Sequence, residues 1–324
     1  MKKFIFLLFS FLLIIIATIT WFVNGLIPLN QNKMLKRFEI TPGETASQIG
    51  LDLEKQGFIK NALSFRIYSQ VSQSSKNIKP GSYELTSNLW IPQIINKLLA
   101  GPQEIWVTIP EGLRREEVVD KFTESFGLEG TLAVNFKNQF LKLTQVKEGY
   151  LFPDTYLFPK DITPQTVVKI MEDNFNKKYV SVQNSKTSNL NKEQTIILAS
   201  IIQREAITPE DMKGVASVLV NRYNLNSPLG SDVTVEYALG FDKNENSWWK
   251  KDLTADDLQI NSSYNTRQNV GFPPAPISNP GLVAIKAALN PPQTDYIYYL
   301  SDKDGKLHFA KTLEEHNINI EKYL

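Results

Sequence analysis

Residues 194–206, QTIILASIIQREA, are the most informative segment of the chain. Asn191, followed three residues later by Gln194, gives the capping-box pattern that starts a helix. The apolar residues that follow have the three- and four-residue spacing of a buried helix face: Ile197, Leu198, Ile201 and Ile202. The pattern predicts a core helix that carries Glu205 near its C-terminal end.

Glu205 is the candidate catalytic residue of this helix. Ile201 and Ile202 lie four and three positions before it, so its carboxyl is expected to point along the apolar face. Desolvation and the negative end of the helix dipole both disfavour a charged carboxylate there, so we expect a raised pKa. A carboxylic acid that is protonated near neutral pH can act as the general acid of glycosidic cleavage. From this helix alone, a surface glutamate, or one paired with Arg204 or Arg222, is the stronger interpretation.

The N-terminal sequence predicts one membrane-spanning helix. Residues 4–23 contain no charged residue and follow Lys2 and Lys3, and about 20 apolar residues are enough to cross the hydrocarbon core. A cleaved signal peptide is the alternative, but bulky residues at 21–23 (WFV) stand where a cleavage site needs small ones. The short N-terminal arm favours a cytoplasmic N-terminus and an exported body. We therefore expect residues 1–35 to be a cytoplasmic tip, a transmembrane anchor and a tether.

Two later segments resemble each other, and both look like the start of a LysM module. Residues 38–49 (FEITPGETASQI) and 107–118 (VTIPEGLRREEV) each predict a short strand, a turn and the start of a helix. Between them, a helix stopped by Gly57, a second helix capped by Asn61 and a strand at 82–85 complete the LysM order. We expect residues 36–147 to be a LysM-like region with a possible internal repeat. Glycan binding and mere spacing by a small α+β scaffold are equally supported interpretations.

Residues 148–324 are expected to form an α+β catalytic domain, which makes the whole chain α+β with one N-terminal transmembrane helix. The domain begins with the aromatic-rich stretch 148–159 (EGYLFPDTYLFP), whose rings either fill a core or stack on sugars. A proline-stiffened loop at 271–281 (GFPPAPISNPG) cannot form a strand ladder. Rigid loops of this kind are where ligand contacts concentrate.

Composition excludes several classes of function. With 35 basic and 34 acidic residues, the chain has no charge excess that would favour nucleic acid as a partner. It has no cysteine, which excludes thiolate nucleophiles, disulfides and cysteine-rich zinc sites. His308 and His316 lie far from any acidic cluster in the sequence, so we expect no metal site and no cofactor.

Several ordered motifs resemble the YceG-like family of endolytic murein transglycosylases. They are EGYLFPDTY, LASIIQREA, NRY, DVTVEYALG, SYNTRQNVGFPPAPISNPG and the closing stretch from residue 296 to residue 324. Several motifs in a fixed order are far more specific than a single short pattern. The chain departs from the family pattern at Gln203, where a second glutamate is usual, and at Val233, where proline is common.

The resemblance implies that Glu205 is catalytic and that the substrate is the glycan strand of peptidoglycan. It implies cleavage of the β-1,4 bond between N-acetylmuramic acid and N-acetylglucosamine, with Glu205 as acid and then base and a 1,6-anhydro end as product. A second carboxylate is not required, because the 2-acetamido group of the substrate can stabilise the transition state. The similar polar positions are candidate substrate-binding residues: Asp232, Thr234, Tyr264, Asn265 and Thr266.

The implied location is the bacterial cytoplasmic membrane, with the catalytic body outside the cytoplasm near nascent strands and the cell-wall synthases or division proteins that make them. Two other functions remain open. One is a non-catalytic peptidoglycan-binding or division scaffold, and the other is a lysozyme-type hydrolase that uses Asp232 or Glu236 as a second carboxylate. A pyridoxal-phosphate lyase is disfavoured by the N-terminal span and by the lack of a recognisable cofactor-lysine context.

Overall fold

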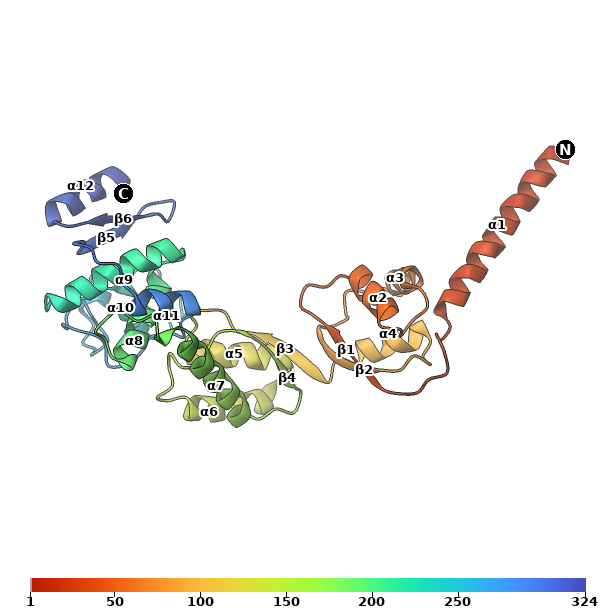
Figure 1. Ribbon diagram of the computed structural model, residues 1–324, viewed down its shortest axis with the longest axis horizontal. Coiled ribbons are helices and arrows are strands. Elements are labelled where there is room, and N and C mark those ends of the chain that lie inside the picture. The colour runs from red at the N-terminus through yellow and green to blue at the C-terminus, as the bar shows by residue number, and fades with distance from the viewer. Residues whose placement is uncertain (1) are drawn as a thin grey trace. The chain divides into compact units, whose positions relative to one another are not determined.

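The computed structural model describes residues 2–324, with side chains described from Leu7 onward. Helices and strands are mixed along the chain, which confirms the predicted α+β class (Figure 1). The chain divides into two compact units, each with its own apolar core. The first unit contains the residues up to Val107 and Tyr156–Asp161, and the second contains Thr108–Thr155 and Ile162–Leu324. The functional division at residues 35 and 147 stays a prediction.

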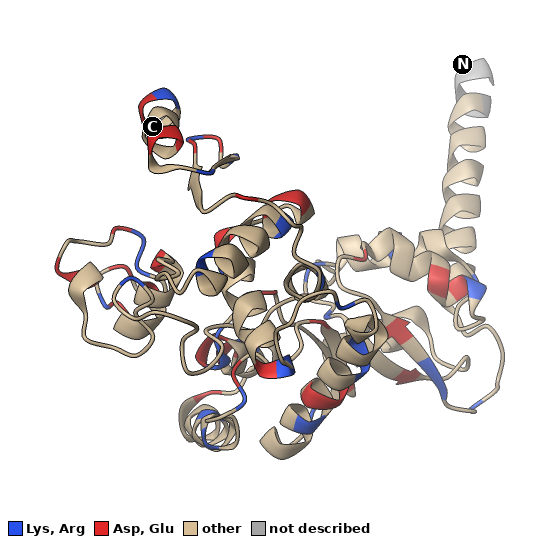
Figure 2. Ribbon diagram, turned by 60° about the vertical axis from the view of Figure 1, so that its left-hand side comes forward, with Lys and Arg blue, Asp and Glu red and all other residues tan. Residues whose placement is uncertain are grey.

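Helix α1 (Lys2–Leu26) is long and apolar enough to cross a membrane. Its stretch Leu7–Leu26 has a mean hydropathy of 2.3 and is the one such helix in the described part of the chain. Figure 2 shows no charged residue along the part of the helix from Leu7 to Leu26. Its C-terminal end packs on the first unit, because Gly25 is buried and a Cβ atom there would lie 2.0 Å from the Ser64 hydroxyl. Leu26 packs against the core of the same unit.

The first unit has the strand, helix, helix, strand order expected from the sequence. Strand β1 (Lys36–Ile40) is followed by α2 (Ala46–Lys55), α3 (Ala62–Val71) and β2 (Gly81–Leu85). Strands β1 and β2 pair antiparallel, with Phe38 opposite Tyr83. Both predicted helix starts are present, since Thr45 caps α2 and Asn61 caps α3. That this arrangement is a LysM module stays a prediction.

Two further strands extend the sheet in the order β1-β2-β3-β4. Strand β3 (Glu104–Thr108) follows α4 (Ile91–Leu99), and strand β4 (Thr155–Pro159) comes after α5 (Arg115–Phe126) and α6 (Gly130–Leu143). The second of the two similar segments therefore also forms a strand and the start of a helix.

Helix α8 (Lys192–Glu205) lies at the centre of a group of helices in the second unit (Figure 1). Helices α9 (Pro209–Asn224) and α11 (Leu282–Leu289) contact α8 and each other, α7 (Pro164–Gln183) contacts α11, and α10 (Asp232–Leu239) contacts α8. A short 3₁₀ turn, η1 (Asp257–Gln259), contacts α10. Apolar side chains at the interior of this arrangement are fully buried, among them Leu198, Ile201, Val215 and Ile285.

A hairpin and a helix end the chain. Strands β5 (Tyr298–Ser301) and β6 (Leu307–Ala310) pair antiparallel, and α12 (Leu313–Tyr323) packs on both. Strand β5 also contacts α9. Through this contact the hairpin joins the group of helices that includes α8, which carries Glu205.

Candidate active site

Helix α8 places Glu205 as its last residue. The predicted capping box is present, with the Gln194 amide donating to Asn191 Oδ1 at 2.8 Å and the Asn191 amide donating to Gln194 Oε1 at 2.9 Å. Residues 195–202 are all buried, so the helix is covered on every side and not only on the expected apolar face. The two ends of the helix are less covered: Lys192 and Glu193 are exposed in the first turn, and the last turn, which carries Glu205, is partly exposed.

The Glu205 carboxyl accepts hydrogen bonds from two hydroxyl groups. The Ser231 hydroxyl donates to Glu205 Oε1, and the Tyr299 hydroxyl donates to the same carboxyl group. Burial raises the pKa of Glu205 and is the largest influence on it, while the two hydroxyl groups act in the opposite direction. The nearby charge of Asp232 raises this pKa and that of Arg222 lowers it. The net shift is upward, as expected from the sequence.

Neither neighbouring arginine forms an ion pair with Glu205 among the side chains described from Leu7 onward. Arg222 is occupied by backbone carbonyls, because its Nε donates to Ile297 at 2.7 Å and its Nη1 donates to Leu229. Arg204 instead stacks on a tryptophan, with its guanidinium carbon 3.8 Å from the centre of the Trp249 ring. The interpretation of Glu205 as half of a structural ion pair is therefore not supported.

Two predicted site residues hold Ser231 in position. Thr266 Oγ1 accepts a hydrogen bond from the Ser231 amide at 3.1 Å, and the Thr234 hydroxyl donates to the Ser231 carbonyl at 2.7 Å. The two threonine hydroxyls also lie 2.9 Å apart. Thr234, Thr266 and Ser231 are all buried, so these groups form a rigid support beneath Glu205.

The other three predicted residues lie nearby in different roles. Asn265 is buried, and its amide donates to the carbonyls of Leu258 and Ile260 at 3.1 and 3.0 Å. Tyr264 is partly buried and packs on Tyr237. Asp232 forms an ion pair with an arginine, and about half of its side chain is exposed. Substrate contact by any of the five candidates stays a prediction.

Neither hydroxyl donor was predicted from the sequence. Ser231 immediately precedes α10, where a serine commonly caps a helix, so its position could have been noticed in the GSDVTVEYALG motif. Tyr299 lies 94 positions after Glu205, and nothing in its local sequence connects the two. Only the fold brings them together.

Helix α9 brings Tyr299 to Glu205 by holding the segment that precedes β5. Asn221 donates from its amide to the carbonyls of Thr294 and Tyr296, at 2.8 and 2.9 Å. On the same helix, Gly214 lets the Phe309 ring approach so closely that a Cβ atom would lie 2.1 Å from it. The hairpin therefore has a fixed position relative to α9.

A second carboxyl with a raised pKa lies on α10. Burial raises the pKa of Glu236 to about 7, with further upward influence from Glu205, Asp232 and Glu245, while Arg204 opposes it. Glu236 is thus within electrostatic reach of Glu205, as is Asp232. These are the two residues considered as partners in a hydrolase.

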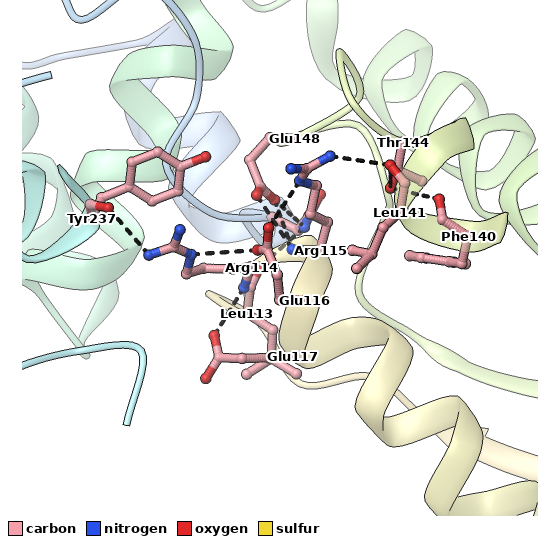
Figure 3. A network of polar contacts seen from close by, with 11 residues as sticks. Leu113, Arg114, Arg115, Glu116, Glu117, Phe140, Leu141, Thr144, Glu148 and Tyr237 are labelled. Carbon is pink, nitrogen blue, oxygen red and sulfur yellow. Dashed lines mark hydrogen bonds and ion pairs between the residues drawn. The ribbon is translucent and has the colours of Figure 1, made fainter. Parts of the chain in front are cut away.

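The loops next to α8 are tied together by one buried asparagine. Asn279 Oδ1 accepts from the amides of Gly149 and Leu151 at 3.0 and 2.9 Å, and its side-chain amide donates to Glu148 at 2.8 Å. Figure 3 shows Glu148 beside Arg115, whose backbone amide donates to both carboxyl oxygens. Burial, reinforced by the charge of Glu116, raises the pKa of Glu148 to about 8.

Gln203, one of the departures from the family pattern, also ties a loop to α8. Its Oε1 accepts a hydrogen bond from the Gly281 amide at 2.9 Å, at the start of α11. An uncharged side chain is sufficient for this contact, and Glu205 remains the only acidic residue in the last turn of the helix.

No cluster of three or more His, Asp or Glu side chains suited to a metal ion occurs within the described residues. His308 lies 2.8 Å from Asp302 and stacks on Tyr323, and His316 stacks on Tyr298. Both histidines are thus engaged in packing of the C-terminal hairpin and helix.

Known proteins resemble this chain over most of its length. It is 31% identical to the endolytic murein transglycosylase of Bacillus subtilis, over 90% of this chain and 86% of that protein. It is 28% identical to the endolytic murein transglycosylase of Streptococcus pneumoniae, over 93% of this chain, and spans 61% of the length of that relative. A crystal structure of a yceG-like protein from Listeria monocytogenes aligns with a TM-score of 0.60 at 30% identity, covering 88% of this chain and 99% of the other. The profile of the YceG-like family matches residues 38–322, and the chain therefore belongs to the YceG-like family.

Proposed function

We propose that the protein is a lytic transglycosylase that cleaves the β-1,4 bond between N-acetylmuramic acid and N-acetylglucosamine in peptidoglycan. The observation that carries the proposal is the state of Glu205, a desolvated carboxyl with a raised pKa and two hydroxyl donors. Such a group can hold a proton near neutral pH and release it to a leaving oxygen. The names of the Bacillus and Streptococcus relatives support this class of substrate and reaction.

In the proposed reaction, Glu205 first donates its proton to the glycosidic oxygen, and the bond to the muramoyl C1 breaks. The substrate acetamido group stabilises the positive charge that develops at C1. Glu205, now a carboxylate, takes the proton from the muramoyl 6-hydroxyl, whose oxygen then bonds to C1. The products are an N-acetylglucosamine end and a 1,6-anhydro-muramoyl end, and no water is consumed.

Ser231 and Tyr299 act as positioning residues in this reaction. Their hydroxyl groups hold the Glu205 carboxyl in one orientation and stabilise its charged form after the first proton transfer. Thr234, Asn265 and Thr266 support this arrangement from below, since their polar groups bond to the protein itself. Of the predicted substrate contacts, Asp232 and Tyr264 keep accessible side chains and are the ones proposed to contact the sugar.

Membrane anchoring by α1 is part of the proposal. A helix with a predominantly apolar stretch of 20 residues has the length of a membrane span, and the packing of Gly25 against α3 supports a helix that stays joined to the body. An anchored enzyme with its body outside the cytoplasm would act on strands close to the membrane, near the synthases that make them. Cleavage within strands is a separate part of the proposal, supported by the endolytic names of the relatives.

The test is mass spectrometry of glycan strands incubated with the full-length protein in detergent micelles. We expect anhydro-ended products from the unchanged protein and none from Glu205→Gln. Glu193→Gln, which changes an exposed glutamate at the other end of the same helix, is the matched control and should retain activity.

The same experiment separates the alternatives. Products with free reducing ends, lost in Glu236→Gln or Asp232→Asn, would make the protein a hydrolase. Binding of strands without any cleavage would favour the scaffold function.

A further inference from the structure

Two aromatic rings lie at the surface just after α10. Phe241 is 43% exposed, and Trp248 is partly buried. Their ring centres lie 5.2 Å apart with an angle of 66° between the planes, so the two rings form an edge-to-face pair. A paired set of large aromatic rings that remains accessible to solvent often marks a contact surface.

A tight hairpin holds this Phe241–Trp248 pair in place. Asp242 and Ser247 exchange backbone hydrogen bonds of 2.7 and 3.1 Å. Within the turn, the Asp242 carboxylate accepts from the amides of Asn244 and Glu245 at 2.7 and 3.0 Å. The rings are therefore carried on an ordered turn, so little conformational entropy would be lost when a ligand binds.

The next tryptophan has a clearly different role. Trp249 is buried, and its indole N–H donates to Glu117 at 2.9 Å. It fixes the base of the hairpin to the helix α5. Trp248 instead rests on Arg114, whose guanidinium carbon lies 4.6 Å from the Trp248 ring centre and 4.1 Å from that of Tyr237. Figure 3 shows Arg114, the residue just before α5, reaching toward Tyr237.

A chain of stacked side chains links the pair to the helix end that carries Glu205. Arg114 lies over the rings of both Trp248 and Trp249. Arg204, the residue before Glu205, stacks directly on Trp249. Glu236 is within electrostatic reach of both Glu205 and Glu245, and Glu245 belongs to the hairpin itself. The rings, two carboxylates and the catalytic acid therefore belong to one continuous region of the second unit.

We propose that Phe241 and Trp248 form a subsite on which an N-acetylated sugar of the glycan strand stacks, away from the bond that Glu205 cleaves. An aromatic face binds the apolar C–H face of a sugar ring, and carboxylates such as Glu245 accept hydrogen bonds from hydroxyl and amide groups at its edge. This inference rests on the proposed function, since it takes the same strand as ligand.

The first test is equilibrium binding in the Glu205→Gln background, so that the strand is not consumed. The full-length protein in micelles is titrated with purified glycan strands of defined length. We expect Trp248→Ala and Phe241→Ala to raise Kd about tenfold, and Trp248→Phe to recover most of the affinity. Leu225→Ala, which removes an exposed apolar side chain elsewhere in the same unit, is the control and should leave Kd unchanged.

The second test compares turnover of short and long strands with Glu205 intact. Trp248→Ala should raise KM for long strands with little change in kcat, and should have a small effect on strands too short to reach the subsite.

Unchanged Kd in both alanine variants would overturn the subsite, whatever the enzymatic result. So would a loss of kcat and of melting temperature without any change in Kd, because Trp248 would then be structural. If the unchanged protein cleaves nothing while Trp248→Ala still weakens binding, the subsite stands and the proposed reaction fails.

Discussion

Ser231 and Asp232 shift the pKa of Glu205 in opposite directions, so substitutions at these two residues should move the pH profile of the reaction in opposite directions. The Ser231 hydroxyl stabilises the carboxylate, so Ser231→Ala should raise the pKa of Glu205. The Asp232 charge destabilises the carboxylate, so Asp232→Asn should lower that pKa. The acid must be protonated to act, so the alkaline limb of kcat/KM should move to higher pH in the first variant and to lower pH in the second.

The measurement is a pH profile of strand cleavage for both variants, with Ser263→Ala as an exposed serine control in the same unit. Limbs that move in the same direction would show that another group sets the profile.

The raised pKa of Glu148 should make the stability of the second unit depend on pH. Its pKa is raised to about 8 in the folded protein from an ordinary value of 4.5, so between these values the folded state holds more protons than the unfolded state. The free energy of unfolding should therefore fall as pH rises through this window, by about 1.4 kcal/mol per pH unit from this group. Glu148→Gln keeps an acceptor for the Arg115 and Asn279 amides and does not titrate.

Thermal unfolding at pH 5 and pH 8 tests the Glu148 prediction. The unchanged protein should lose several degrees more than Glu148→Gln between the two pH values, which is the shift expected for a few kcal/mol. Glu193→Gln serves as the surface control. Equal losses in all three proteins would mean that Glu148 is ionised throughout.

At the scale of single residues, the sequence predicted those parts of the site that depend on local patterns. The cap at Asn191 and the raised pKa of Glu205 follow from the pattern of one helix, and the structure agrees with both. The roles of Ser231 and Tyr299 depend on contacts between segments far apart in the chain, so no local pattern indicates them. Thr234 and Thr266 are recognisable in the sequence as polar residues, but their burial depends on how α10 and the segment around Thr266 pack together.

At the scale of elements, the approach of the C-terminal hairpin to α9 is the feature most sensitive to change. Gly214→Ala would add a Cβ atom 2.1 Å from the Phe309 ring, so the hairpin must move. The gain in helix propensity is about 1 kcal/mol, whereas overpacking costs about 1 to 3 kcal/mol, so a net loss of stability is expected. Because the hairpin carries Tyr299, kcat should also fall, by about tenfold.

A double-mutant cycle tests whether Gly214 acts through Tyr299. Tyr299→Phe alone should lower kcat, and adding Gly214→Ala to it should lower kcat little further, because the hydrogen bond is already absent. Fully additive losses would mean that the hairpin affects the reaction by another route. Leu313→Ala on α12 is the control, since that side chain is exposed.

The types and order of the helices and strands were largely predictable from the sequence, but which elements pack against one another was not. The strand, helix, helix, strand order after the tether follows from turn residues and caps, and it is present in β1, α2, α3 and β2. Helix α8 was expected to bury one face, yet α9, α10 and α11 leave residues 195–202 no exposed side. The small side chains of Ala199 and Ser200 allow this, and the Ser200 hydroxyl accepts a hydrogen bond from the Ile277 amide at 3.0 Å.

At the scale of the whole molecule, the proposed anchoring by α1 predicts where the protein acts. If α1 only keeps the body near the membrane, an unrelated single-span helix in its place should preserve function in a bacterium that lacks its own copy. A cleavable signal peptide in its place should export the body but lower cleavage of new strands by about tenfold or more, because the local concentration at the membrane is lost.

The amount of anhydro ends in newly made glycan measures this, and each form is paired with its Glu205→Gln variant to subtract other enzymes. Full activity of the released body would mean that membrane proximity is unimportant. Failure of the unrelated anchor, with normal protein levels, would instead assign a specific role to α1. In that case the contact of Gly25 with Ser64 on α3 is the first place to look, because a side chain at residue 25 would separate the end of the span from the body.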